Sequence, residues 1–160
     1  FASMKNGLKM PDDPGMADER TTLKHRNLPL LLLQARESIF SRFRPLLNAA
    51  DLTEQQWRVI RALLDNGPLE PRQIGDICCL SSPSLAGILA RMDDMGLVQR
   101  ERLEHDQRRV MVSVTDKGQA LAVGLAPQIE DAYAELEAQI GKEFVQGLYQ
   151  TLDQLLAKLK

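Results

Sequence analysis

Apolar residues recur every three or four positions along residues 83–95, which is the spacing of one face of an α-helix. Ser82 suits the N-cap position, Pro83 suits the first helical position, and Gly96 ends the pattern. The face opposite the apolar one consists of small or hydroxyl side chains and one arginine: Ser84, Ala86, Gly87, Ala90 and Arg91. Because a solvated helix face normally carries Glu and Lys, small side chains on this face indicate that the helix approaches another surface closely.

Two short segments with β-strand character follow this helix. Residues 97–103 and 110–115 are rich in β-branched side chains and alternate between apolar and polar positions. The residues between them, 104–109, are all polar and include Arg108 and Arg109. The pattern predicts a β-hairpin whose turn spans 104–109 and carries two arginines at its tip.

Two helices are expected upstream. The first runs from Pro29, which suits a first helical turn, to about Asn48, with Pro45 bending its last turn. The second follows Thr53 and Gln56, which have the spacing of a capping box, and extends to residue 65. Its expected buried face consists of Trp57, Ile60, Leu63 and Leu64.

A short helix at 71–79 is expected to turn Ile74, Ile77 and Cys78 inward before a tight turn leads to the helix at 83–95. After the hairpin, Thr115 is expected to cap a long helix to residue 140, and a last helix follows Gly141. These two helices and the first one carry more apolar surface than one small core can cover. The excess predicts dimerisation.

This order of elements is that of a winged helix-turn-helix, so the expected fold is mainly α with a small β-hairpin wing. We expect residues 51–115 to form a DNA-binding lobe, and residues 23–50 and 116–160 to form a helical dimerisation region. Residues 1–22 are expected to be a flexible N-terminus, in which the three residues before Met4 resemble a leader left by expression.

Composition disfavours several other classes of protein. The chain has neither the roughly 18 consecutive apolar residues of a membrane span nor a signal-peptide core, so we expect a cytoplasmic protein with no membrane partner. His25 and His105 lack partners at metal-ligand spacing, and no catalytic triad or phosphate-binding glycine loop is evident. Cys78 and Cys79 are interpreted as small apolar fillers rather than a disulfide or redox sensor. We therefore expect no metal, no cofactor and no enzymatic activity.

The formal net charge of −2 is unusual for a protein that binds nucleic acid. Positive charge is gathered locally, however, because residues 21–48 hold five Lys or Arg against one acid, and the hairpin holds four arginines. Electrostatic attraction decays over about 10 Å at ordinary salt, so the local distribution of charge matters more for DNA binding than the net charge of the chain. Double-stranded DNA remains the expected partner.

The candidates for DNA contact lie on the small-residue helix and on the hairpin. Small side chains let the helix enter a major groove, where Ser and Arg bond phosphates or base edges, and hairpin arginines fit a narrow minor groove. Alternatively, the arginines belong to a solvated face or to intramolecular ion pairs, and the winged helix is a protein-interaction module. The candidate residues are Ser81, Ser82, Ser84, Gly87, Arg91, Arg108 and Arg109.

Three segments, GLVQR at 96–100, DQRRV at 106–110 and VTDKG at 114–118, resemble the signature of the MarR family of transcriptional regulators, with Val114 where leucine is usual. The segment HRNLPLLLLQARE resembles the branch that contains repressors of homoprotocatechuate degradation and hydroxynicotinate-responsive regulators. The resemblance covers about residues 23–160. It implies a homodimeric repressor on a pseudo-palindromic operator, with Arg108 in the minor groove and Asp106 bracing the wing through an arginine.

The resemblance also implies a small aromatic carboxylate effector, of the hydroxyphenylacetate, homoprotocatechuate or hydroxynicotinate type, that releases the repressor from DNA. A carboxylate needs a cation and an aromatic ring needs a flat apolar wall, which makes His25, Arg26, Arg36 and Trp57 the candidates for its pocket. Alternatively, Trp57 belongs to the core, Arg36 pairs with an acid across the dimer, and His25 is disordered. A dual activator and repressor with a different effector is the other functional alternative.

Overall fold

The computed structural model describes residues 22–160, and the chain divides into two units, Phe1–Arg36 and Glu37–Lys160. The expected flexible N-terminus with its leader therefore lies, except for Thr22, outside the described residues. Helix α1, Leu28–Phe40, begins in the first unit and ends in the second. Its start is capped by Asn27, whose Oδ1 accepts a hydrogen bond from the N–H of Leu30 at 3.1 Å.

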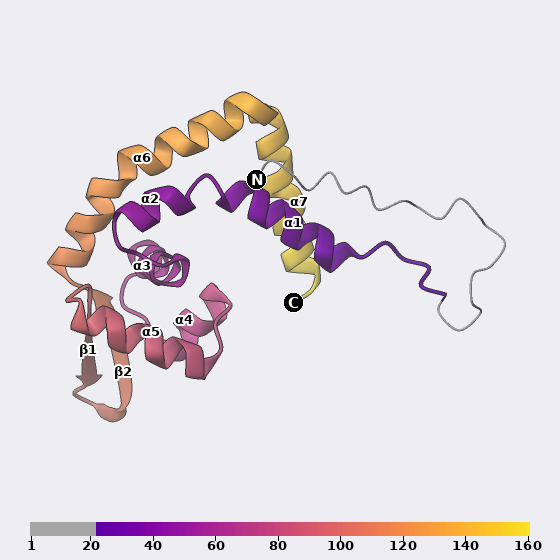
Figure 1. Ribbon diagram of the computed structural model, residues 1–160. Coiled ribbons are helices and arrows are strands. Elements are labelled where there is room, and N and C mark those ends of the chain that lie inside the picture. The colour runs from indigo at the N-terminus through magenta and orange to yellow at the C-terminus, as the bar shows by residue number, and fades with distance from the viewer. Residues whose placement is uncertain (1–21) are drawn as a thin grey trace. The chain divides into compact units, whose positions relative to one another are not determined.

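The second unit is mainly helical and contains one two-stranded antiparallel hairpin, which confirms the predicted fold class (Figure 1). The hairpin separates the short helices of the unit's first half from two long helices at its end. In chain order these elements are α2 (Arg44–Ala49), α3 (Glu54–Asn66), α4 (Pro71–Cys78), α5 (Ser82–Asp94), β1 (Val98–Leu103), β2 (Asp106–Val114), α6 (Asp116–Ile140) and α7 (Lys142–Lys158).

The single helix expected over residues 29–48 is two helices, so that prediction was wrong. Helix α1 ends at Phe40, a turn follows, and α2 begins at Arg44 with Pro45 in its first turn. A proline inside a continuous helix would clash with the carbonyl four residues earlier, whereas its missing N–H costs nothing in a first turn. The turn lets Phe43 pack into the core, where its ring lies 4.8 Å from that of Tyr133.

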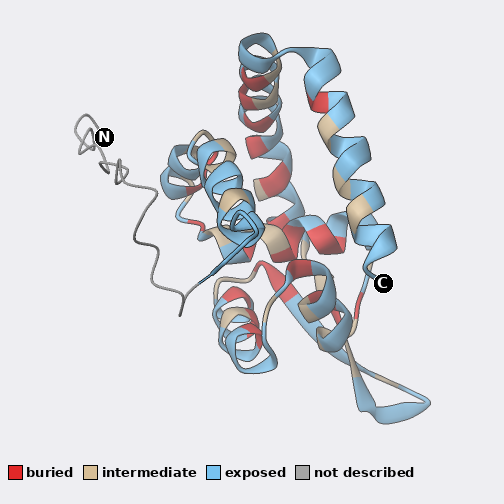
Figure 2. Ribbon diagram, turned by 90° about the vertical axis from the view of Figure 1, so that its right-hand side faces the viewer, coloured by how far each residue is buried: buried red, intermediate tan, exposed pale blue. Residues whose placement is uncertain are grey.

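Helix α3 supplies the centre of the core, because Val59 and Ile60 have no exposed surface. Figure 2 shows buried residues on inner faces of the unit, while the end of the hairpin is exposed. Two residues that were expected on the buried face are less buried than predicted, because Trp57 is only half-buried and Leu64 is 40% exposed. The elements that pack on α3 contribute Ile74, Leu85, Leu89, Met92, Val112, Ala122 and Leu125 to the same core.

The turn of the hairpin is shorter than predicted. Glu104 and His105 alone form it, and β2 begins at Asp106. Arg102 pairs with Val110 while Leu103 pairs with Asp106, so residues 107–109 form a bulge in β2. Arg108 and Arg109 therefore lie on this bulge beside the tip and not in the turn itself.

The turn between α4 and α5 also differs in detail from the prediction. Ser81, not Ser82, is the N-cap of α5, and its hydroxyl oxygen accepts from the N–H of Ser84. Cys79 adopts a left-handed conformation with φ of 55°, which reverses the chain after α4. Ile77 was expected to be buried but is 50% exposed, whereas Ile74 and Cys78 on the same helix are buried as expected.

No single helix among residues 22–160 is both long and apolar enough to cross a lipid bilayer. Taken together, α4 and α5 meet that criterion by length and composition alone, across a bend of 109°.

Candidate functional site

The outward face of α5 is exposed along its whole length. Ser84, Gly87 and Arg91 lie on this face, with Ser81 and Ser82 exposed at its N-terminal end. No atom lies within 4 Å of the position that a Cβ on Gly87 would occupy. The helix backbone can therefore approach a partner closely, as a helix must to reach base edges in a major groove.

A groove of about 370 Å³ joins this face to the first turn of α3. Ser84, Gly87 and Arg91 line one side of it, and Thr53 and Gln55 belong to the α3 side. The predicted capping box holds this turn in place. The N–H of Gln56 donates to Thr53 Oγ1 at 3.1 Å, and the N–H of Thr53 donates to Gln56 Oε1 at 3.0 Å.

Three of the four hairpin arginines are engaged by partners within the protein. Arg100 pairs with Asp93 at 3.0 Å, Arg102 donates to the main-chain oxygen of Gln107 at 2.5 Å, and Arg109 pairs with Glu70. The hydrogen bond to Glu70 and its charge raise the pKa of Arg109. The guanidinium of Arg108 is exposed, and no partner engages it among residues 22–160. Arg108 is therefore the hairpin arginine that can bind phosphate without first breaking a hydrogen bond or an ion pair of its guanidinium within the described residues.

Asp106 contacts the main chain of the bulge. Its Oδ1 accepts a hydrogen bond from the N–H of Arg108 at 3.0 Å, which is the Asx-turn type of contact. The brace of Asp106 through an arginine side chain stays a prediction, and the contact that the structure shows is with the backbone of Arg108. This contact orients the residue that carries the available cation.

Arg58 fastens the turn of the helix-turn-helix to α3. Its Nη1 donates to the main-chain oxygen of Cys78 at 2.7 Å, and the Cys78 thiol donates to the main-chain oxygen of Arg58 at 3.5 Å. Burial raises the pKa of the Cys78 thiol, and the charge of Arg58 offsets this only partly. Cys78 is therefore a neutral, structural residue at neutral pH, whereas Cys79 is exposed.

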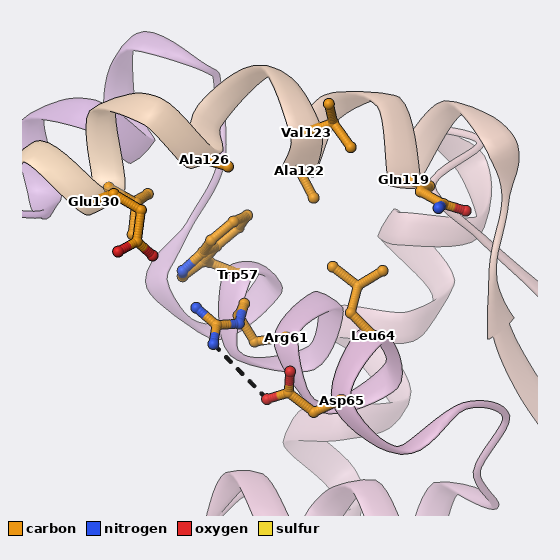
Figure 3. A pocket seen from close by; sticks show the side chains of 10 residues that line it. Trp57, Arg61, Leu64, Asp65, Gln119, Ala122, Val123, Ala126 and Glu130 are labelled. Atoms are coloured by element: carbon orange, nitrogen blue, oxygen red, sulfur yellow. Dashed lines mark ion pairs between the residues drawn. The ribbon is translucent and has the colours of Figure 1, made fainter.

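A second pocket, of about 310 Å³, lies between α3 and α6 (Figure 3). Trp57 supplies a flat aromatic wall from α3, opposite Ala122 and Ala126 of α6. Arg61, one helical turn after Trp57, points its guanidinium toward Asp65, 3.8 Å away. This ion pair is exposed and contributes little, so Arg61 can be redirected toward a ligand at low cost.

Two acids limit what this pocket can accept. Asp65 and Glu130 lie on its lining, so an anionic group is favourable only beside Arg61. The rest of the lining is apolar or neutral, from Leu64, Ala122, Val123 and Ile129 to Gln119. A flat ring with one acidic substituent matches this distribution.

Of the residues predicted for the ligand pocket, only Trp57 lines this one. His25, Arg26 and Arg36 are exposed residues of the unit Phe1–Arg36, and their contribution to a shared site stays a prediction. Among the described residues, no group of three His, Cys, Asp or Glu side chains could hold a metal ion.

Arg61 and Glu70 were not among the residues predicted from the sequence. The spacing of Arg61 four residues after Trp57 places both on one helix face, so the signal was present in the sequence. Glu70 is 39 residues from Arg109, its partner, and no local pattern could have indicated the pair.

Comparison with known proteins extends these observations. Residues 50–109 match the MarR family. The chain is 42% identical to the homoprotocatechuate degradative operon repressor of Escherichia coli over 133 residues, covering 83% of this chain and 90% of that protein. It is 40% identical to the HTH-type transcriptional regulator FarR of Neisseria gonorrhoeae over 123 residues, covering 77% and 84%. The solved structure of NadR in complex with 4-hydroxyphenylacetate superposes with a TM-score of 0.75 at 38% identity, covering 84% and 96%.

Proposed function

The chain belongs to the MarR family of transcriptional regulators, which are DNA-binding proteins and not enzymes, and from this premise we propose a specific function. The protein is a homodimeric, cytoplasmic repressor of an aromatic-acid catabolic operon. A small aromatic carboxylate of the hydroxyphenylacetate, homoprotocatechuate or hydroxynicotinate type releases it from its operator.

The DNA contacts are assigned to α5 and the bulge of β2. The exposed, small-residue face of α5 enters the major groove, and Arg108 reaches the adjacent minor groove. In a two-fold dimer the α5 helices of the two copies meet successive major grooves, about 34–36 Å apart. An operator with two inverted half-sites follows from this symmetry.

The observation that carries the effector assignment is the Trp57 and Arg61 pair in the pocket between α3 and α6. The indole stacks on an aromatic ring, and the guanidinium binds the carboxylate in place of Asp65. The similar protein NadR binds 4-hydroxyphenylacetate, which has both of these groups. The expectation that His25, Arg26 and Arg36 contribute to ligand binding stays a prediction.

Release follows from the position of the pocket. Helix α3 belongs to the proposed DNA-binding lobe and α6 to the proposed dimerisation region, so a ligand between them changes the spacing of the two α5 helices. A spacing that no longer matches one turn of DNA weakens operator binding.

A ligand panel tests this function. We expect 4-hydroxyphenylacetate, 3,4-dihydroxyphenylacetate or 6-hydroxynicotinate to raise the melting temperature and to release a labelled DNA duplex, selected from a random library by the protein itself. The corresponding alcohol, 4-hydroxyphenethyl alcohol, lacks the carboxylate and should do neither. At a concentration of about 100 times Kd, the stabilisation should be about 2.7 kcal/mol.

Variants locate the site. Arg61→Ala should weaken binding of the active acid by about 1.5–3 kcal/mol, because a charge-assisted hydrogen bond is lost. Lys142→Ala, which removes an exposed cation at the start of α7, is the matched control. If no acid of the panel changes either the melting temperature or DNA binding, the effector class is wrong. If the protein selects no DNA at all, the interaction-module alternative is favoured.

A further inference from the structure

The end of α5 is joined to the first turn of α6 by contacts that the proposed function does not use. Thr115 Oγ1 donates to the main-chain oxygen of Gly96 at 2.5 Å, and the N–H of Thr115 donates to the main-chain oxygen of Leu97 at 3.0 Å. Lys117 Nζ donates to the main-chain oxygen of Met95 at 2.7 Å. The beginning of α6 is therefore bonded to three consecutive carbonyl groups, of which the first belongs to the C-cap of α5 and the other two follow it.

Lys117 also has an electrostatic role at this junction. Met95 is the C-cap of α5, so the ammonium group lies at the end of α5 where unpaired carbonyl groups concentrate negative charge. A cation in this position stabilises the helix terminus and, because it is carried by α6, ties the two helices together.

Gly118 makes the close approach of α6 to the segment that follows α5 possible. It is buried, and a Cβ at this position would clash with the main-chain oxygen of Leu97 and lie 2.8 Å from Val114 Cγ1. Its backbone is ordinary helix, so glycine is needed for close contact and not for its conformational freedom. At Gly124, on the same helix, a Cβ would have no neighbouring atom within 4 Å. Close packing therefore does not require glycine at position 124.

The same helix lines the pocket immediately after the junction. Gln119, the next residue after Gly118, belongs to the pocket lining, followed by Ala122, Val123 and Ala126. At 1.5 Å per residue, Ala126 lies only about 12 Å along α6 from Gly118. One continuous stretch of α6 therefore contacts the end of α5 and forms the pocket wall opposite Trp57.

We propose that Thr115, Lys117 and Gly118 form a rigid clamp through which a displacement of α6 at the pocket is passed to the end of α5. These three are positioning residues, since they act on DNA binding through the placement of α5. The proposal rests on the proposed function and adds the route by which pocket and DNA face are coupled. Coupling between two sites is reciprocal, so DNA bound to α5 must also change the surroundings of Trp57.

Trp57 is the only tryptophan of the chain, so its fluorescence reports this change without any effector. The full-length protein is titrated with its selected DNA duplex, and binding is followed by anisotropy of the labelled DNA. Saturating DNA should shift the Trp57 emission of the wild-type protein. Gly118→Ala and Lys117→Ala should still bind the duplex, with affinity reduced by less than about tenfold, but should lose most of the emission shift.

Controls separate coupling from stability. Gly124→Ala makes the same substitution on the same helix, where a Cβ has open space, and should keep the full DNA-induced shift in Trp57 emission. Lys117→Arg keeps a cation at this position and should restore the emission shift that Lys117→Ala loses. Residues with only a structural role would lower the melting temperature while leaving the emission shift at saturation intact. Should Gly118→Ala fail to fold, Lys117→Ala alone decides, because it removes one exposed ammonium group.

Two results would overturn the clamp: a wild-type protein that binds DNA with no change in Trp57 emission, or clamp variants whose shift equals that of the wild type. A wild-type protein that binds no DNA would instead refute the proposed function and remove the premise of the clamp. The two failures are thus distinguished by the anisotropy signal.

Discussion

At the scale of single residues, neighbours in sequence occupy opposite environments at the turn of the helix-turn-helix. Cys78 is buried and bonded to Arg58, whereas Cys79, in the left-handed conformation that ends α4, is exposed. The expectation of small apolar fillers describes Cys78 well but not Cys79, which is on the surface. The difference arises because the chain reverses direction between the two side chains.

This difference predicts unequal thiol reactivity. Burial raises the pKa of the Cys78 thiol, so less thiolate is present near neutral pH than at an exposed cysteine. Timed alkylation followed by mass spectrometry should label Cys79 first, and Cys79→Ser should abolish the fast phase. Equal labelling rates for both cysteines would contradict the burial of Cys78.

The raised pKa of Cys78 also determines how the free energy of unfolding changes with pH. The pKa of Cys78 is higher in the folded state than in the unfolded state. The stability that the protonated thiol contributes is therefore fully present at pH values below the unfolded-state pKa, and it is lost as the pH rises through the folded-state pKa. A pH series of denaturant melts of Cys79→Ser checks this direction.

At the scale of elements, the wing separates two neighbouring arginines into different roles. Arg109 is held against Glu70, the N-cap residue of α4, and the same strand, β2, is tied to the segment before α4 by the pairing of Val112 with Leu69. Arg108, on the same bulge, is oriented through its backbone by Asp106. The wing therefore contains one arginine that fixes its position and one that is available to DNA.

Arg108→Ala should weaken operator binding by about 1–3 kcal/mol and reduce the slope of log affinity against log salt by about one, because one phosphate-region cation is lost. Arg109→Ala is the matched comparison. It removes the same charge from the adjacent residue, but it also frees Glu70, so its effect should come through wing position. Anisotropy titrations at several salt concentrations separate the two, and unchanged affinity for Arg108→Ala would exclude the wing from DNA binding.

At the scale of the whole molecule, α7 leaves a large part of its apolar surface uncovered in the single chain. Val145 is its buried residue, while Leu156 is 62% exposed. Soluble proteins rarely expose contiguous apolar surface of this kind unless a partner covers it. The large exposed apolar side chains of α7 and its C-cap are Phe144, Tyr149, Leu156 and Leu159.

We expect this face of α7 to lie in the dimer interface. Leu156→Glu should shift sedimentation equilibrium toward monomer, because each of the two symmetry-related copies loses about 1.5–3 kcal/mol of apolar burial and gains a buried charge. Gln154→Glu adds the same charge two residues away, on a different face of the helix, and should remain dimeric. A dimer of unchanged affinity in Leu156→Glu would place the interface elsewhere.

Local sequence was sufficient for most elements because their signals act within one or two helical turns. The capping box of Thr53 and Gln56, the cap at Thr115 and the alternation of the two strands all predicted elements that the structure contains. The exact N-cap of α5 could not be decided in this way. Ser81 and Ser82 have similar intrinsic preference, and the packing of Leu85 and Leu89 into the core selects the register of the helix.

By itself, the sequence therefore determined the order of the elements, the small-residue face of α5 and the polar, arginine-rich hairpin, since each depends on residues close together in the chain. Only the tertiary structure decided which arginine is available to DNA, that Arg61 and Trp57 share a pocket with α6, and that Gly118 lies against Leu97. These features join residues about 20 to 70 positions apart. Such contacts form only when packing of the apolar faces brings distant segments together, and no local periodicity encodes them.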